Sequence, residues 1–191
     1  MIPGSSILND LPEQCGALLT YWDGLRGDRI RPERREIDPG AIKSILPFIY
    51  ILEAASHGEV RFRLAGTALR DLFGFELSGR NHIELAPPAH RRLRSYRMWT
   101  HMHHPCGACY SRRVPFSTGI REFCHGILLP LASDHADGPP LAIAIEVPEA
   151  GPRWLNPAAS ALLQAVEDFA YFDIGAGVPD KAEPPDDWDV A

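Results

Sequence analysis

The sequence has no long apolar run. Its longest apolar stretches, ILLPLA and LAIAI, are far shorter than the roughly 20 residues that a membrane-spanning helix needs. Its first residues, MIPGSSILNDLPEQ, do not place an apolar segment after a basic one, so we expect no secretory signal. Only four cysteines are present, without the even spacing of a disulfide framework. These absences predict a soluble protein of the reducing cytoplasm with no membrane partner.

Positive charge is also scarce, because the net charge of the chain is −6. Proteins built around nucleic acid usually carry a strongly basic surface. The one basic cluster, between Arg26 and Arg35, is mixed with acidic residues and has no aromatic side chains between its arginines. We therefore expect no nucleic-acid partner.

The short motifs of common enzymes are absent as well, since the sequence contains no GxSxG, HExxH, P-loop or GxGxxG. Cys124 and His125 could in principle form a nucleophile and its base. Neighbours on a strand point to opposite faces, however, so these two side chains cannot share a hydrogen bond. We expect a protein that is not an enzyme, with a small cysteine-dependent enzyme as an alternative.

One stretch, THMHHPCGACY, gathers three histidines and two cysteines within the nine positions His101–Cys109. Neutral histidines and a CxxC pair are good zinc ligands, and Cys124 with His125 could complete the set. A zinc-binding regulatory protein is therefore a second alternative. Two of these histidines share a helix stripe with Arg94 and Arg97, however, and arginines repel a dication. We expect no bound metal here.

Apolar patterns predict five β-strands. FIYILEA is apolar on both faces, as in a central strand, whereas VRFRLAG alternates between apolar and charged residues. ACYSRRVPF contains Pro115, which predicts a strand at the edge of a sheet. The predicted strands are Phe48–Ala54, Val60–Gly66, Ala108–Phe116, Arg121–Leu131 and Pro140–Val147. We expect an α+β fold in which helices cover one face of a five-stranded antiparallel sheet.

Helical patterns flank and interrupt these strands. An apolar stripe from Leu11 to Leu25 predicts an amphipathic N-terminal helix, and Asn156 with Pro157 predicts the start of a C-terminal helix. The residues from Gly175 onward have little to bury, so we expect them to be disordered. The predicted divisions are an N-terminal helical extension (1–46), a central domain (47–148), a C-terminal helix (149–174) and a disordered acidic tail (175–191).

The order of these elements, with the phrases RFRLAGTALRDLFGFELSGR and FCHGILLPLA, resembles the PAS domains. More narrowly, the chain is similar to a bacterial subgroup of stand-alone PAS proteins, from about Tyr21 to Val147. The resemblance implies that residues 47–148 are a PAS-like sensor domain, with the helices between Thr67 and His104 cupping a cavity. It also implies that the domain binds a small ligand or a partner protein and signals to a separate, unidentified effector.

The predicted cavity is apolar with one polar group. Phe62 and Leu64 share one strand face, which should look toward the helices, and Phe123, His125 and Ile127 share one face of a later strand. Apolar cavities with a few polar groups are typical small-molecule sites. The expected ligand-binding residues are Phe62, Leu64, Phe73, Tyr96, Trp99, Phe123, His125 and Ile127. The alternative is that these side chains pack as a closed core.

The sequence leaves the cofactor unknown. His82 could face the cavity and hold a heme, as in some PAS domains, although a lone histidine is more often structural. The apolar stripe of the first helix must be covered, either by the outer face of the chain's own sheet or by a partner chain, and PAS-like domains often pair through flanking helices. We therefore expect a homodimer with Leu18 and Trp22 at its interface.

Overall fold

The computed structural model describes residues 11–115, 121–135, 137–149, 163 and 165–190. The six strands lie in one antiparallel sheet in the order β2-β1-β5-β4-β3-β6. The strands are β1 (Ile49–Ala54), β2 (Val60–Ala65), β3 (Gly107–Pro115), β4 (Arg121–Leu131), β5 (Leu141–Pro148) and β6 (Asp168–Phe172). The helices are α2 (Glu13–Arg26), α3 (Thr67–Phe73) and α4 (Arg91–His103), with 3-10 turns at Arg34–Glu36, Leu46–Phe48 and Pro88–His90. The predicted α+β class is confirmed, with one strand more than expected.

The position of β1 inside the sheet is as predicted, because it pairs with β2 on one side and β5 on the other. The prediction that β3 lies at an edge is wrong, since β6 pairs with it from Gly107 to Ser111. Pro115 is the last residue of β3, beyond the last residue that pairs with β6. Its missing N–H therefore removes no hydrogen bond from that pairing.

The C-terminal helix predicted over 149–174 is also corrected. Residues 150–162 and 164 lie outside the described residues, and Asp168–Phe172 form strand β6. In the sequence DFAYF, Phe169 and Tyr171 pack on one side of the sheet, and Ala170 and Phe172 on the other. This alternation of β-prone aromatic residues fits the open edge of β3 better than it fits a helix.

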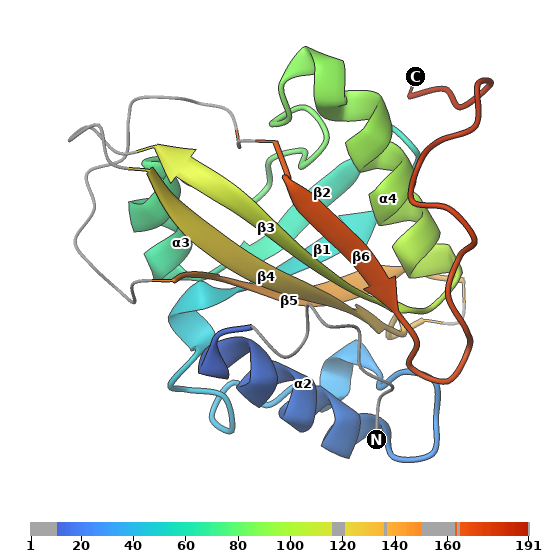
Figure 1. Cartoon of the computed structure of the whole chain (residues 1–191). Coiled ribbons are helices and arrows are strands. Elements are labelled where there is room, and N and C mark those ends of the chain that lie inside the picture. The colour runs from blue at the N-terminus through green and yellow to red at the C-terminus, as the bar shows by residue number, and fades with distance from the viewer. Residues whose placement is uncertain (1–10, 116–120, 136, 150–162, 164, 191) are drawn as a thin grey trace.

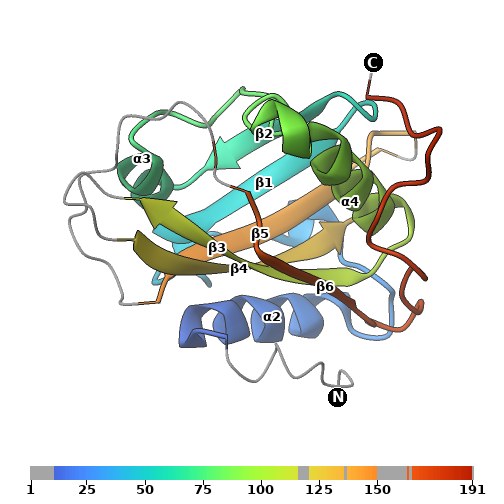
Figure 2. The same cartoon turned by 45° about the horizontal axis from the view of Figure 1, so that its top comes forward.

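Apolar side chains fill two layers, one on each face of the sheet. Figures 1 and 2 show α2 on one face and α3 with α4 on the other, so the N-terminal helix takes the outer face of the sheet, which was one of its two expected positions. Leu18 and Trp22 are fully buried in the α2 layer, and Trp22 Nε1 donates a hydrogen bond to the Pro130 carbonyl at 2.9 Å. The predicted interface through these two residues is wrong, because the chain's own sheet covers them. The expected homodimer itself stays a prediction.

The residues that follow β6 lie along α4 (Figure 1), which corrects the expected disorder from Gly175 onward. The Trp188 ring stacks on His57 with centroids 3.9 Å apart, and its Nε1 donates to Ser95 Oγ at 3.0 Å. Arg97 of α4 donates to the Ala182 carbonyl at 3.1 Å. A basic helix and one aromatic anchor therefore hold a tail whose composition is otherwise polar. Among the described residues, no helix is long and apolar enough to cross a membrane.

Candidate functional site

Four polar side chains lie on the sheet face that α3 and α4 cover. They are buried to at least 96%, and they are Tyr50 of β1, Tyr110 and Arg112 of β3, and Glu146 of β5. They share a face because side chains alternate along a strand and because Tyr110, Gly126 and Glu146 lie opposite one another across β3, β4 and β5. The sheet therefore carries a polar patch beneath its helices, and we call these four residues the polar floor.

Gly126 lets the polar floor extend across three strands. A Cβ atom at Gly126 would lie 2.3 Å from Cζ of Tyr110, so only a residue without a side chain leaves room for that ring. The Tyr110 hydroxyl donates to Glu146 Oε2 at 2.6 Å, and the Tyr50 hydroxyl lies 2.9 Å from the Tyr110 hydroxyl. Because Tyr110 has already used its only proton, Tyr50 is the donor in the second bond.

Arg112 and Glu146 form a buried ion pair with two contacts. Arg112 Nε donates to Glu146 Oε1 at 2.7 Å, and its Nη2 donates to Oε2. Burial alone would lower the pKa of Arg112, but the carboxylate of Glu146 raises that pKa above its ordinary value. The guanidinium carbon lies 5.2 Å from the ring centroid of Phe73. Among the described residues, Arg112 Nη1 has no hydrogen-bond partner, so one end of the guanidinium remains unsatisfied.

Two further buried groups, Arg94 of α4 and His82, face the floor from the helical side. Arg94 Nη1 donates to the backbone carbonyl of His82 at 3.2 Å. Burial, followed by the charge of Arg112, lowers the pKa of Arg94 to about 9. Burial, followed by the charges of Arg94 and Arg112, holds the pKa of His82 well below its ordinary value, so the ring is neutral at pH 7. Its Nδ1 has no hydrogen-bond partner among the described residues.

A cavity of about 40 Å³ lies between these groups and α4. Tyr50, His82, Arg94, Tyr110 and Arg112 form its polar side. The other described residues that line it are His90, Leu93, Arg97, Met98, Leu128, Val166 and Phe169. Sites for drug-sized ligands are roughly 300–1,000 Å³, so this cavity suits only a small molecule. His82 does face the cavity as the sequence suggested, but a heme does not fit it.

Some of the predicted ligand-binding residues lie in the layer that contains this cavity, but none of the eight lines it. Phe62 and Phe73 are buried in that layer, and Trp99 packs against it. Tyr96 instead meets the ring of Trp188, with centroids 5.1 Å apart. Leu64 is 41% exposed. Ile51 pairs with Leu64 and Leu52 with Phe62, so Arg63 is an extra residue that reverses the alternation at a β-bulge.

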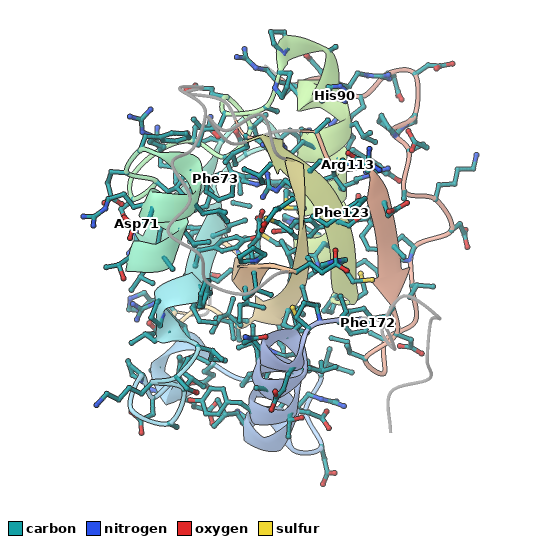
Figure 3. The ribbon with its side chains drawn as sticks, turned by 60° about the vertical axis from the view of Figure 1, so that its left-hand side comes forward. Asp71, Phe73, His90, Arg113, Phe123 and Phe172 are labelled. Carbon is teal, nitrogen blue, oxygen red and sulfur yellow. The ribbon has the colours of Figure 1, made fainter. Side chains whose placement is uncertain are left out.

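The predicted residues of β4 lie on the wrong face. Ile127 belongs to the α2 layer. Phe123 and His125 are half-buried on that same face, and Figure 3 labels Phe123 beside Arg113, whose guanidinium carbon is 4.5 Å from its ring centroid. The stretch ILLPL is apolar on both faces, so periodicity alone could not show which face meets the helices. Gly126, opposite Tyr110, was the available signal.

The residues of the His101–Cys109 stretch point in different directions. His101 is fully buried, whereas His103 is exposed and stacks on Trp99 with ring centroids 3.7 Å apart. Cys109 Sγ donates to the Ala170 carbonyl at 3.6 Å. Burial raises the pKa of Cys106 to about 12 and that of Cys109 to about 11, so both are thiols at pH 7. In the described ranges, no group of three histidine, cysteine or acidic side chains could hold a metal ion. The expected lack of metal binding itself stays a prediction.

Comparison with known proteins gives one family match. The sequence profile of the PAS domain matches residues 12–142, which is more than half of the chain. No curated protein matches the chain. Fourteen chains of solved structures match it, among them one described as a fungal LOV domain photoreceptor that reveals a conserved pathway integrating blue-light and oxidative stress. That alignment has 17% sequence identity and a TM-score of 0.36, and covers 53% of this chain and 73% of the other.

Proposed function

Because the chain belongs to the PAS domain family, we propose that it is a sensory and regulatory domain. It binds a small molecule in the cavity beneath α4 and passes a conformational change to a separate effector protein. One observation carries the proposal: the cavity combines an apolar wall with buried polar atoms that have no partner within the described residues. This combination is the usual form of a small-molecule site, whereas a closed structural core satisfies its buried polar groups.

Arg97 supports a route from the cavity to the protein surface. Its side chain lines the cavity, and its guanidinium carbon lies 4.4 Å from the ring centroid of Phe169. The same guanidinium donates to the Ala182 carbonyl and to Glu183 Oε1, each at 3.1 Å. A ligand that moves Arg97 therefore changes how residues 173–190 are held against α4. We propose that this tail segment carries the output.

The state of the cysteines favours a binding domain over a cysteine-dependent enzyme. All four thiols are buried. Burial raises the pKa of each one, to about 12 for Cys15, and to a still higher value for Cys124, the nucleophile of the alternative considered above. A nucleophilic cysteine needs the opposite shift and an exposed position. We therefore propose a non-enzymatic role.

A screen of small acids, amides, alcohols and amines tests the proposal, with melting temperature and hydrogen exchange of residues 173–190 as readouts. At least one compound should raise the melting temperature and change exchange in the tail. The Leu128→Phe variant, which fills the cavity, should lose both effects. Leu129→Phe is the matched control, because Leu129 is the next residue on β4 and lies in the α2 layer. Equal responses in both variants, or no response to any compound in the parent protein, would contradict the proposal.

A further inference from the structure

We propose that one face of α4 is the docking surface for the effector, and that the effector supplies an acidic segment with a tryptophan. This docking surface comprises His57 together with Arg92, Ser95, Tyr96 and Arg97 of α4. Residues 180–190 of this chain lie on it (Figure 1) and have the same chemistry, so they act as an internal competitor of the effector. The inference rests on the proposed function and specifies the partner and where it binds.

The charges of α4 and of the tail segment are complementary. The sequence of α4, RRLRSYRMWTHMH, contains four arginines and no acidic residue. Residues 173–190 contain six acidic residues and a single lysine. An ion pair joins the two segments directly, from Arg97 Nη2 to Glu183 Oε1 at 3.1 Å. A basic helix face of this kind, in a chain whose net charge is −6, selects an acidic partner.

Two arginines of α4 hold the tail through backbone carbonyls, which every peptide possesses. Arg92 Nε donates to the Trp188 carbonyl at 3.2 Å, and Arg92 Nη2 donates to the Pro185 carbonyl. Arg97 Nε donates to the Ala182 carbonyl at 3.1 Å. These hydrogen bonds do not depend on the side chains of the bound segment, so an acidic segment from another protein can make them equally well.

The indole of Trp188 gives the docking surface its specificity. Its ring stacks on His57 with centroids 3.9 Å apart and meets the Tyr96 ring edge-on at 5.1 Å. The Ser95 hydroxyl donates its only proton to the His57 carbonyl at 2.6 Å, so it accepts from Trp188 Nε1 at 3.0 Å. Because a phenyl ring has no N–H for this acceptor, the surface favours tryptophan over phenylalanine.

The tail is held in a way that allows its displacement. Within the described ranges, no backbone hydrogen bond joins residues 175–190 to the rest of the chain. Trp188 is only half-buried, and the side chain of Glu183 is 70% exposed. Segments held by few buried contacts open at a low free energy. Since Arg97 also lines the cavity, a ligand there changes how strongly the tail competes with the effector.

Binding of a labelled peptide to the full chain tests the inference. The probe is a synthetic peptide with the sequence of residues 180–191, DKAEPPDDWDVA, followed by fluorescence anisotropy. Trp188→Ala in the protein weakens the internal competitor, so this variant should bind the peptide about tenfold more tightly than the parent does. Val178→Ala, a change at an exposed position of the same tail, is the matched control and should bind as the parent does. Equal affinities of the parent and Trp188→Ala, or no binding to Trp188→Ala, would overturn the inference.

Altered peptides show which chemistry is recognised. In the Trp188→Ala protein, a peptide with alanine in place of its tryptophan should bind at least about tenfold more weakly than the original peptide. A peptide whose acidic residues are replaced by their amides should lose affinity to a similar extent. If the peptide without tryptophan binds as tightly as the original, the surface is a general anion patch and the inference fails.

Substitution of Arg92 locates the binding site. Arg92→Gln, added to the Trp188→Ala protein, should weaken peptide binding. Arg91→Gln is the matched control, because Arg91 is the preceding residue and donates to the carbonyls of Glu84 and Ala86 instead of to the tail. Circular dichroism checks that each variant is folded. Equal peptide affinities of the two variants would show that the peptide does not bind on this face of α4.

Light scattering examines the other possible occupant, the tail of a second copy of this chain. The parent protein and Trp188→Ala should have the same mass in solution. A dimer that dissociates on Trp188→Ala would show that tails are exchanged between copies, and the effector assignment would be wrong. The small-molecule screen is independent of these experiments. If a compound of that screen binds the cavity and no peptide binds α4, this inference fails and the ligand-binding function stands.

Discussion

The buried side chain of His101 should make the free energy of unfolding fall in weak acid. The side chain is fully buried, and neither ring nitrogen makes a hydrogen bond of good geometry within the described residues. Burial lowers the pKa of His101 to about 4, although a contact with the backbone of Cys106 acts in the opposite direction. The native protein therefore holds the ring neutral, whereas the unfolded chain protonates it near pH 6.5.

The sign and size of the effect follow from this difference in pKa. Between pH 6.5 and pH 4 the unfolded state binds more protons than the native state, so the free energy of unfolding falls as the pH falls. Between pH 7 and pH 5 the loss attributable to His101 is about 2 kcal/mol, and below pH 4 it levels off at about 3 kcal/mol. His82, whose pKa is also lowered by burial, contributes in the same direction.

A comparison of variants isolates the His101 contribution. Urea unfolding followed by circular dichroism is measured at pH 7, 6 and 5 for the parent protein and for His101→Leu. At pH 7 the variant should be about as stable as the parent, because an apolar side chain replaces an unsatisfied polar one. At pH 5 it should be the more stable by about 2 kcal/mol. His103→Leu, an exposed change on the same helix, is the control and should not produce this crossover. Parallel pH profiles for the parent and His101→Leu would refute the reasoning.

Three further predictions follow from packing. Gly126→Ala should lower the free energy of unfolding by about 1–3 kcal/mol, because the added Cβ meets the Tyr110 ring. Gly24→Ala, at a helix position with open space around it, should raise the free energy of unfolding by up to about 1 kcal/mol. Urea unfolding that ranks the two variants the other way would contradict this prediction. Trp188→Ala removes the stacking on His57, so amide exchange in residues 175–190 should accelerate while exchange in the sheet does not, and unchanged exchange in the tail would count against the anchor. The four buried thiols should react with an aromatic disulfide reagent only after urea is added, and fast reaction of the native protein would show that at least one is accessible.

The sequence predicts the strands well because their apolar patterns are long and regular. All five predicted strands are present within one or two residues of their expected bounds. The sixth strand was missed because 150–174 combine a helix-start signal at Asn156 with only five residues of alternating aromatic pattern. The order of the tail could not be predicted for a related reason, since its average composition does not reveal that a single aromatic residue, Trp188, anchors it.

The candidate site was harder to predict than the fold. Its key residues, Tyr110, Arg112 and Glu146, lie inside strands whose other side chains are mostly apolar, and the strand pattern does not distinguish them from their neighbours. Their meeting depends on the register of three strands and on the missing side chain of Gly126. Strand periodicity also does not predict a β-bulge. Because Arg63 is an extra residue in β2, the side chain of Leu64 is exposed to solvent instead of facing the helices. Long-range register, rather than local propensity, therefore decides which residues form the site.

The pairing of Arg112 with Glu146 also has a consequence for how the sheet assembles. β5 is almost entirely apolar, with every residue buried, so its side chains alone would tolerate several alignments against β4. A slip of one residue would turn Glu146 into the apolar layer beneath α2 and leave the guanidinium of Arg112 buried without a countercharge. Removing one partner of a buried ion pair typically costs about 3–5 kcal/mol. The pair of Arg112 and Glu146 therefore also selects the strand register, because a shifted alignment of β5 against β4 that keeps the apolar residues buried would separate the two charges.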